Sequence, residues 1–219
     1  MIDSDHMTPA ERLEAIFGSP IEPHLRKQMD TDPPCDPTIQ MAGGEYFNFE
    51  HPEDSCFTIN DIAHALSHVC RFGGHVIEYY SVAQHSVSVS RLVPEEHALA
   101  GLLHDASEAF LGDVVMPLKR MLPDYRAIEH RVQAAIHRRY GLPEEMHECI
   151  KHSDRRMLAT ERRDLMPERP GDAWECIAGV TPLGATIRPM RPAEAKKSFL
   201  ARWTAITEMR LSVRPLDPS

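Results

Sequence analysis

Residues 104–113 read His-Asp-Ala-Ser-Glu-Ala-Phe-Leu-Gly-Asp and follow the apolar run Ala98–Leu103. The apolar spacing predicts a helix from about Glu95 to Phe110, which ends at Gly112 because glycine commonly terminates helices. Projection at about 100° per residue gives this helix an apolar side and a second side with three polar residues, His104, Asp105 and Glu108. A helix this apolar is not expected on the solvated surface, so these three side chains are predicted to face the interior.

Helical periodicity continues on both sides of this stretch. Further helices are predicted from Thr58 to Gly73, from Ser81 to Pro94, from Asp124 to Gly141, from Pro143 to Leu165 and from Ala193 to Leu211. The first two begin with typical capping pairs, in which a hydroxyl residue is followed three positions later by Asp61 or Gln84. A short strand is expected at Tyr46–Phe49. The sequence therefore predicts an all-α fold.

The chain is expected to divide into three parts. Residues 1–44 form an N-terminal arm rich in proline and glycine, with a short helix from Thr8 to Phe17. The helical domain spans residues 45–167, and residues 168–219 form a C-terminal extension. The last helix of this extension carries an apolar stripe made of Phe199, Trp203 and Ile206. This stripe either docks on the helical domain or pairs with another subunit.

Charge and composition exclude several classes of protein. The 219 residues include 33 acidic side chains against 24 Lys and Arg, a net charge of -9, which argues against a general nucleic-acid coat or binding to an anionic membrane surface. No apolar run approaches the length of a membrane span, and the acidic start of the chain is unlike a signal peptide. The five cysteines are scattered without a C-x-x-C motif, which suits a reducing compartment. We therefore expect a cytoplasmic protein.

Histidine is the unusual component, because 11 of the 13 histidines lie between Glu45 and Met166. A single inward histidine is more often a hydrogen-bonded core residue than a metal ligand, so enrichment alone assigns no role. His130 and His137 fall opposite the apolar stripe of their helix and are expected to face solvent. A chemical role therefore requires several inward polar groups that meet.

Polar side chains from three helices are expected to meet in the interior. His85 falls on the buried stripe of its helix, and Asp154 lies on the inward face of a later helix. An unpaired carboxylate in a core is costly, so this group needs a cation. Two imidazoles and two carboxylates suit one divalent metal ion, with the ligands His85, His104, Asp105 and Asp154. Glu108, one turn after His104, would lie beside the ion as a base or acid, and Asp113 would orient the same water or the leaving group.

The order His…His-Asp…Asp on consecutive helices resembles the HD-domain metal-dependent phosphohydrolases. The run His104–Glu108, with Gly112-Asp113 and Pro117-Leu118-Lys119 after it, is similar to the small single-domain branch that contains bacterial 5′-deoxynucleotidases and phage dATP triphosphohydrolases. The resemblance covers about Glu45 to Pro167. It implies an HD-domain helical bundle and one divalent metal ion, whose identity stays open among Mn, Co, Zn, Fe and Mg.

The resemblance also implies roles for individual residues. The family's metal ligands are matched by His85, His104, Asp105 and Asp154. Glu108 matches the acidic residue that handles the attacking water or the leaving group, and Asp113 matches a second catalytic-site Asp. Arg71 and Phe72 match an Arg–aromatic pair that contacts nucleotide, with Phe72 where the deoxynucleotidases have Trp. Lys119 matches a basic residue near the phosphate, although a lysine in a solvated turn would be equally ordinary.

The expected function is removal of phosphate or triphosphate from a 5′-(deoxy)nucleotide by metal-activated water, with cations such as Arg71 and Lys119 holding phosphoryl oxygens. The expected partners are the nucleotide substrate and further copies of the chain, as a dimer or larger homo-oligomer, without a stable nucleic-acid complex. Two alternatives stay open. One is a hydrolase of a signalling nucleotide such as (p)ppGpp, and the other is a non-catalytic nucleotide-binding protein.

Overall fold

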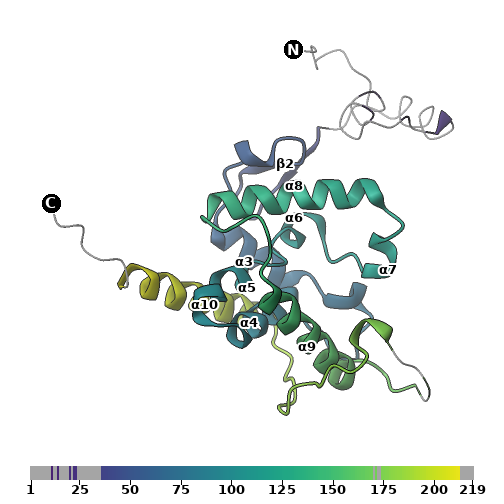
Figure 1. The fold of residues 1–219 in the computed structure, drawn as a ribbon. Coiled ribbons are helices and arrows are strands. Elements are labelled where there is room, and N and C mark those ends of the chain that lie inside the picture. The colour runs from purple at the N-terminus through teal and green to yellow at the C-terminus, as the bar shows by residue number, and fades with distance from the viewer. Residues whose placement is uncertain are drawn as a thin grey trace.

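The computed structural model describes residues 36–169, 171 and 174–212, and before residue 36 only a few isolated positions. The helix expected from Thr8 to Phe17 lies outside the described ranges, apart from two isolated residues. The described part of the chain is built mainly from helices (Figure 1), which confirms the all-α prediction. The longer helices are α3 (Ile59–His68), α4 (Val82–Leu92), α8 (Pro123–Arg139), α9 (Glu148–Leu165) and α10 (Pro192–Ser212).

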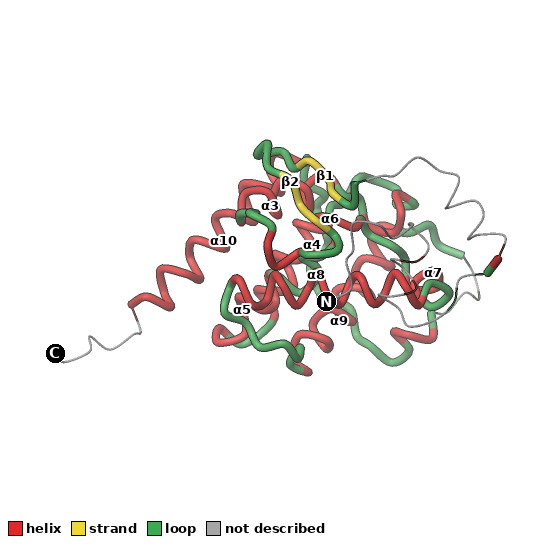
Figure 2. Tube along the Cα trace, turned by 90° about the horizontal axis from the view of Figure 1, so that it is seen from above, coloured by secondary structure: helices red, strands yellow, loops and turns green. Residues whose placement is uncertain are grey.

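Shorter elements connect these helices. The short helices are α5 (Ala98–Leu102), α6 (Glu108–Leu111) and α7 (Met116–Lys119), and the 3-10 turns are η2 (Pro52–Asp54), η3 (Arg71–Gly74), η4 (Glu95–His97) and η5 (Glu175–Ile177). The expected strand is present as β2 (Tyr46–Asn48), which pairs antiparallel with β1 (Thr38–Gln40), a strand that the sequence did not predict. The two strands form a small hairpin at one side of the helices (Figure 2).

Two predicted N-terminal caps are present. The Thr58 hydroxyl accepts the backbone N–H of Asp61 at 3.3 Å, and the Asp61 carboxylate accepts the backbone N–H of Thr58 at 2.9 Å. Ser81 caps α4 in the same way, accepting the N–H of Gln84 at 3.2 Å. Each cap satisfies a backbone donor that the helix itself cannot pair, which stabilises the fold by about 1 kcal/mol.

Two helices begin or end elsewhere than expected. α3 ends at His68, because Val69 and Cys70 are extended and Cys70 pairs with Ser81 in an isolated bridge. This bridge aligns the segment before α4 with the segment after α3 and holds η3 beside α4. α9 begins at Glu148 rather than at Pro143, with the extended residue His147 as its cap.

The single helix expected from Glu95 to Phe110 is wrong, because the chain is broken there into η4, α5 and α6. α5 ends at Leu102 and α6 begins at Glu108, so His104 and Asp105 lie in tight turns and not on a regular helix. The cause is a side chain from another helix. Gln133 of α8 accepts the Ser107 N–H at 2.9 Å and donates to the Leu103 carbonyl at 2.8 Å, which replaces bonds that a continuous helix would make.

The aromatic part of the core joins the hairpin to the helices. The Phe47 ring from β2 stacks on the Phe110 ring from α6 with 3.8 Å between centroids, and Phe57 packs edge-on against Phe110 at 5.5 Å. All three rings are buried. Their packing fixes α6, and with it the turn that precedes Glu108.

The C-terminal helix docks on the other helices, which resolves the two possibilities for its apolar stripe. Phe199 and Ile206 are buried in the main core cluster, and Trp203 packs edge-on against Tyr140 at 5.0 Å. Arg202 adds hydrogen bonds from its guanidinium to the Ser90 hydroxyl and carbonyl, each at 3.0 Å. The C-terminal part of α10 extends beyond the other helices in both views (Figures 1 and 2). Self-association through another surface, and the predicted domain boundaries, stay predictions.

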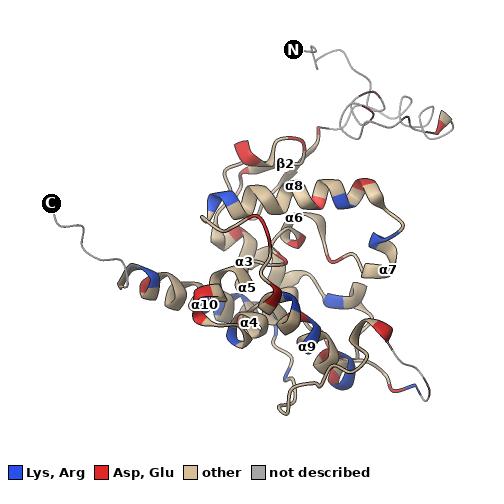
Figure 3. Cartoon of the chain, in the orientation of Figure 1, with Lys and Arg blue, Asp and Glu red and all other residues tan. Residues whose placement is uncertain are grey.

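Charged residues of both signs are distributed over the helices (Figure 3). Acidic and basic positions are mixed along α8, α9 and α10. Within the described ranges, no helix combines the length and the apolar character that crossing a bilayer requires. The four cysteines in this part of the chain are all free, which agrees with the expected lack of a disulfide framework.

Phe199→Ala tests the docking of α10. Removing this buried ring leaves a cavity in the main core, so we expect a loss of about 3–5 kcal/mol in the free energy of unfolding. Urea denaturation followed by circular dichroism measures the change. Met209→Ala on the same helix is the control, because Met209 is 47% exposed and its truncation should change stability by only about 0.5 kcal/mol or less. Equal effects of the two substitutions would contradict the docked position.

Candidate metal centre

His85 lies at the centre of the site and is fully buried in α4. Its Nδ1 is 2.6 Å from a carboxylate oxygen of Glu161 and donates a hydrogen bond to it. Its Nε2 faces the opposite way, 3.1 Å from Oδ1 of Asp154 and 3.2 Å from Nε2 of His104. Because Glu161 holds the proton on Nδ1, Nε2 is the ring atom that can bind a metal ion. Burial lowers the pKa of His85, but the Glu161 and Asp154 carboxylates outweigh it and raise the pKa to about 10, so an ion that binds Nε2 displaces a proton.

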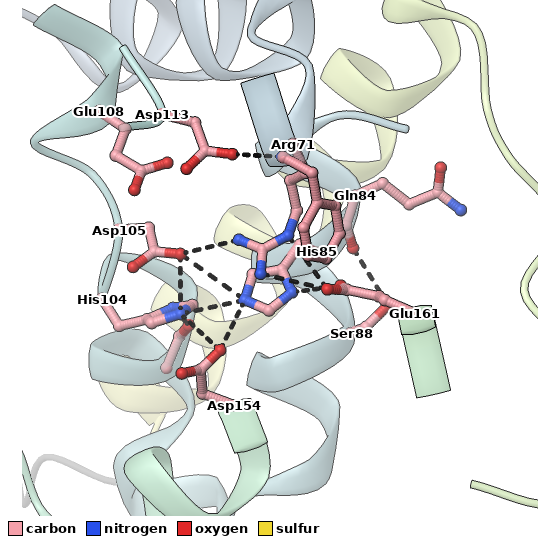
Figure 4. Close-up of polar contacts among 12 residues, drawn as sticks. Arg71, Gln84, His85, Ser88, His104, Asp105, Glu108, Asp113, Asp154 and Glu161 are labelled. Carbon is pink, nitrogen blue, oxygen red and sulfur yellow. Dashed lines mark hydrogen bonds and ion pairs between the residues drawn. The ribbon is translucent and has the colours of Figure 1, made fainter. Parts of the chain in front are cut away.

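His104 and Asp105 enter from the turn between α5 and α6. The Nδ1 of His104 is 2.9 Å from the Gly101 carbonyl oxygen, so its Nε2 faces the site. Oδ2 of Asp105 lies 3.1 Å from that Nε2 and 3.6 Å from Nε2 of His85. Figure 4 shows that the side chains of His85, His104, Asp105 and Asp154 point toward one another from different segments of the chain. The structure thus brings together all four predicted ligands.

The spacing and chemistry of these donors fit one divalent metal ion. The two imidazole Nε2 atoms approach each other and the two carboxylates at 3.1 to 3.9 Å, and ligands bound at about 2.0–2.2 Å to one ion lie roughly this far apart. His85, His104 and Asp105 place one donor atom each within 4.8 Å of one another. Two imidazole nitrogens and two carboxylate oxygens form an ordinary set for a transition metal or magnesium. The two carboxylate side chains are 24% and 38% exposed, so solvent reaches the site from their side.

Glu161 is a site residue that the sequence analysis missed. It is fully buried in α9 and binds His85 through one oxygen. Its other oxygen accepts a hydrogen bond from Nε of Arg71 at 3.1 Å and forms an ion pair with Nη2 of the same guanidinium at 3.1 Å. A spacing signal was available, because Glu161 follows Asp154 by seven residues, which is two helical turns, and therefore lies on the same face of α9.

The Arg71 side chain lies beside the four candidate ligands. It is buried in η3, and Nη1 is 3.5 Å from Oδ2 of Asp105. Burial alone would lower the pKa of this guanidinium, but the carboxylates of Glu161 and Asp105 raise it further above its ordinary value. Arg71 therefore stays charged at the edge of the donor cluster.

The next residue, Phe72, has an unusual backbone. Its φ of 57° and ψ of 31° lie in the left-handed region, which costs a bulky residue about 1–3 kcal/mol. Asp113 stabilises this conformation, because its carboxylate accepts the Phe72 N–H at 2.8 Å. The Phe72 ring contacts Trp174 with 5.9 Å between centroids. Asp113 thus positions η3, and within the described part of the chain it forms no hydrogen bond or ion pair with the four donors.

Glu108 points toward the same region from the start of α6 (Figure 4). It is 4% exposed, and its Oε2 is buried without a hydrogen-bond partner among the described residues. Burial raises the pKa of Glu108 well above its ordinary value, and the carboxylates of Asp105 and Asp113 raise it further. An unpaired buried carboxylate oxygen is costly, so this atom is suited to accept a proton or a hydrogen bond from a bound molecule.

Lys119 lies next to Glu108 and not in a solvated turn. Its ammonium group is 2.5 Å from Oε1 of Glu129 and 3.4 Å from Oε1 of Glu108. Burial lowers the pKa of Lys119, but the two carboxylates outweigh this effect and raise it above its ordinary value. The lysine is therefore charged, and it is already paired with Glu129.

His137 corrects one sequence expectation. It is 5% exposed and not solvent-facing, whereas His130 is exposed as expected. One ring nitrogen of His137 is 2.8 Å from Nε2 of Gln133, and the other is 2.8 Å from the Pro143 carbonyl oxygen. His137 thus contacts Gln133, which in turn forms hydrogen bonds to the turn that contains His104.

Two bacterial proteins match most of this chain. It is 42% identical over 173 residues to the uncharacterized protein YfdR of Escherichia coli K12, a match that covers 78% of this chain and 97% of YfdR. The chain belongs to the YfdR family. An uncharacterized protein of Rhodobacter capsulatus is 32% identical over 180 residues, with 74% of this chain and 92% of that protein covered. No protein-family model matches the sequence.

Glu161→Gln tests the inner support of this YfdR-family site. The substitution keeps the shape but removes the charge that orients His85 and pairs with Arg71, so metal affinity should fall about 10- to 100-fold. Isothermal titration with Mn²⁺ measures the change. Glu208→Gln is the control, because Glu208 is exposed on α10. Unchanged affinity in Glu161→Gln would show that Glu161 does not support the ligands.

Proposed function

We propose that this YfdR-family chain is a metal-dependent phosphohydrolase of the HD type, which removes phosphate or triphosphate from 5′-(deoxy)nucleotides. The observation that carries the proposal is the convergence of His85, His104, Asp105 and Asp154 on one point beside the buried acid Glu108. The same donors in the same chain order are the basis of the resemblance to the HD phosphohydrolases. The site thus supplies both a place for a cation and a group able to exchange a proton.

One divalent ion is assigned to the four donors, where it would polarise phosphoryl oxygens and lower the pKa of bound water. Glu161 orients His85 for this role by accepting a hydrogen bond from its Nδ1–H. The Gly101 carbonyl does the same for His104. Both imidazoles therefore present Nε2 without reorganisation, which favours binding of the ion.

Glu108 is assigned to proton transfer. Its Oε2 is buried and unpaired among the described residues, while Lys119 lies at the other oxygen, 3.4 Å away. A water molecule or a leaving-group hydroxyl that donates to Oε2 would satisfy this atom. General acid–base catalysis by one positioned carboxyl group contributes about 10²–10⁴-fold to a rate.

Arg71 and the residues around it are assigned to the substrate. Glu161 fixes two nitrogens of the guanidinium, and Nη1 lies at the donor cluster, where it can donate to a phosphoryl oxygen. The Phe72 ring, whose backbone Asp113 holds, is assigned to the sugar or base. Lys119 is proposed to contact the outer phosphates of the substrate and to orient the Glu108 carboxyl group. A free nucleotide as substrate fits the expected cytoplasmic location.

Product analysis with defined substrates tests the function. The full-length chain is loaded separately with Mn²⁺, Co²⁺, Mg²⁺ and Zn²⁺ and given deoxyribonucleoside and ribonucleoside mono- and triphosphates. Phosphate from a monophosphate would indicate a nucleotidase, and tripolyphosphate from a triphosphate would indicate a triphosphohydrolase. Hydrolysis of (p)ppGpp alone would favour the signalling alternative. Nucleotide binding without any turnover would refute the enzyme and favour a nucleotide-binding protein.

Glu108→Gln tests the catalytic assignment within that assay. The amide cannot exchange the proton, so turnover should fall about 10²–10⁴-fold while metal stoichiometry stays at the wild-type value. Initial rates and elemental analysis measure the two quantities. Glu145→Gln, at an exposed position before α9, is the matched control and should keep full activity. Full activity in Glu108→Gln would exclude Glu108 as the proton-transfer group.

A further inference from the structure

A second group of metal-binding side chains lies outside the site described above. His97, the last residue of η4, and His147 and Cys149, at the start of α9, place one donor atom each within 4.8 Å of one another. The imidazole rings of His97 and His147 are stacked with 4.1 Å between centroids and 18° between planes. Two segments about 50 residues apart in the sequence thus bring two nitrogen donors and one sulfur donor together.

We propose that His97, His147 and Cys149 form a second metal site of the structural zinc type. Two imidazoles and a thiolate are a ligand set that zinc prefers over magnesium or manganese, which favour oxygen donors. The three donors leave one position of a tetrahedral set for a water molecule.

Buried apolar side chains support this group on one side, whereas its three donor side chains are partly or fully exposed. Val93 and Ile150, which are 8% and 0% exposed, belong to one buried apolar cluster between α4 and α9, and Cys149 packs against it. His147 is exposed and His97 is partly exposed, so one ring can turn out of the stack until a nitrogen of each meets the same ion. In the structure, Nδ1 of His147 accepts the Cys149 N–H at 3.2 Å, a long and weak cap that an ion can replace.

The position of the group suggests what the metal would do. His97 precedes His104 by seven residues, and Cys149 precedes Asp154 by five. An ion that joins these segments would fix the start of α9 against the segment that leads to the catalytic turn. The second site would thereby brace two of the three chain segments that supply ligands to the first.

Cobalt substitution tests the proposal, because the four donors of the first site include no sulfur. The full-length chain is titrated with Co²⁺, and a thiolate-to-cobalt charge-transfer band in the near ultraviolet is expected. Cys149→Ser should remove this band and lower the metal content by about one equivalent per chain. Cys176→Ser, at an exposed free cysteine, is the matched control and should leave both unchanged.

Two further variants separate this site from the first one. His97→Gln keeps the thiol but removes an imidazole, so it should weaken the cobalt band while the circular dichroism spectrum stays native. The double variant His104→Ala, Asp105→Asn should lose the first ion and keep the band. A chain that binds Co²⁺ without a thiolate band, or a band that survives in Cys149→Ser, would overturn the proposal and leave the first site unaffected.

Discussion

The buried carboxylate of Glu161 is the interaction on which the candidate centre depends. A charge in the interior is costly unless it is paired and hydrogen-bonded, and Glu161 obtains this from His85 through one oxygen and from Arg71 through the other. One side chain of α9 thereby sets the proton position on a metal-ligand candidate of α4 and the orientation of the guanidinium of η3. A change at Glu161 must therefore affect metal binding and the assigned phosphate contact together.

The broken helix at His104 is the second constraint. On a continuous helix, two adjacent side chains point about 100° apart. In the turn that replaces it, Nε2 of His104 and Oδ2 of Asp105 lie 3.1 Å apart, so both atoms can reach one ion. The turn persists because Gln133 satisfies its backbone groups and His137 holds Gln133 in place. The geometry of the HD pair therefore depends on α8, which supplies no ligand.

Helical periodicity predicted much of the fold and the inward positions of His85 and Asp154, because burial and spacing on a helix are local properties. His85 and Asp154 were found since each lies on an apolar stripe of its own helix. Glu161 was missed although it shares the face of Asp154, because a glutamate between arginines reads as part of a charged surface when its tertiary partners are unknown. The break at His104 could not be predicted, since its cause is a glutamine of another helix. His137 was misplaced for the same reason, because polar partners compensate its burial.

The charges near the site explain why a cation belongs at its open edge. Arg71 is paired with Glu161, and Lys119 is paired with Glu129, so neither positive charge compensates the donor cluster fully. The remaining negative charge is carried by Asp105 and Asp154, whose side chains are 24% and 38% exposed. This exposed edge would repel a phosphate group if it were left without a metal. A divalent ion held by the two carboxylates would reverse the charge of this edge, beside the unpaired oxygen of Glu108, as the proposed phosphate substrate requires.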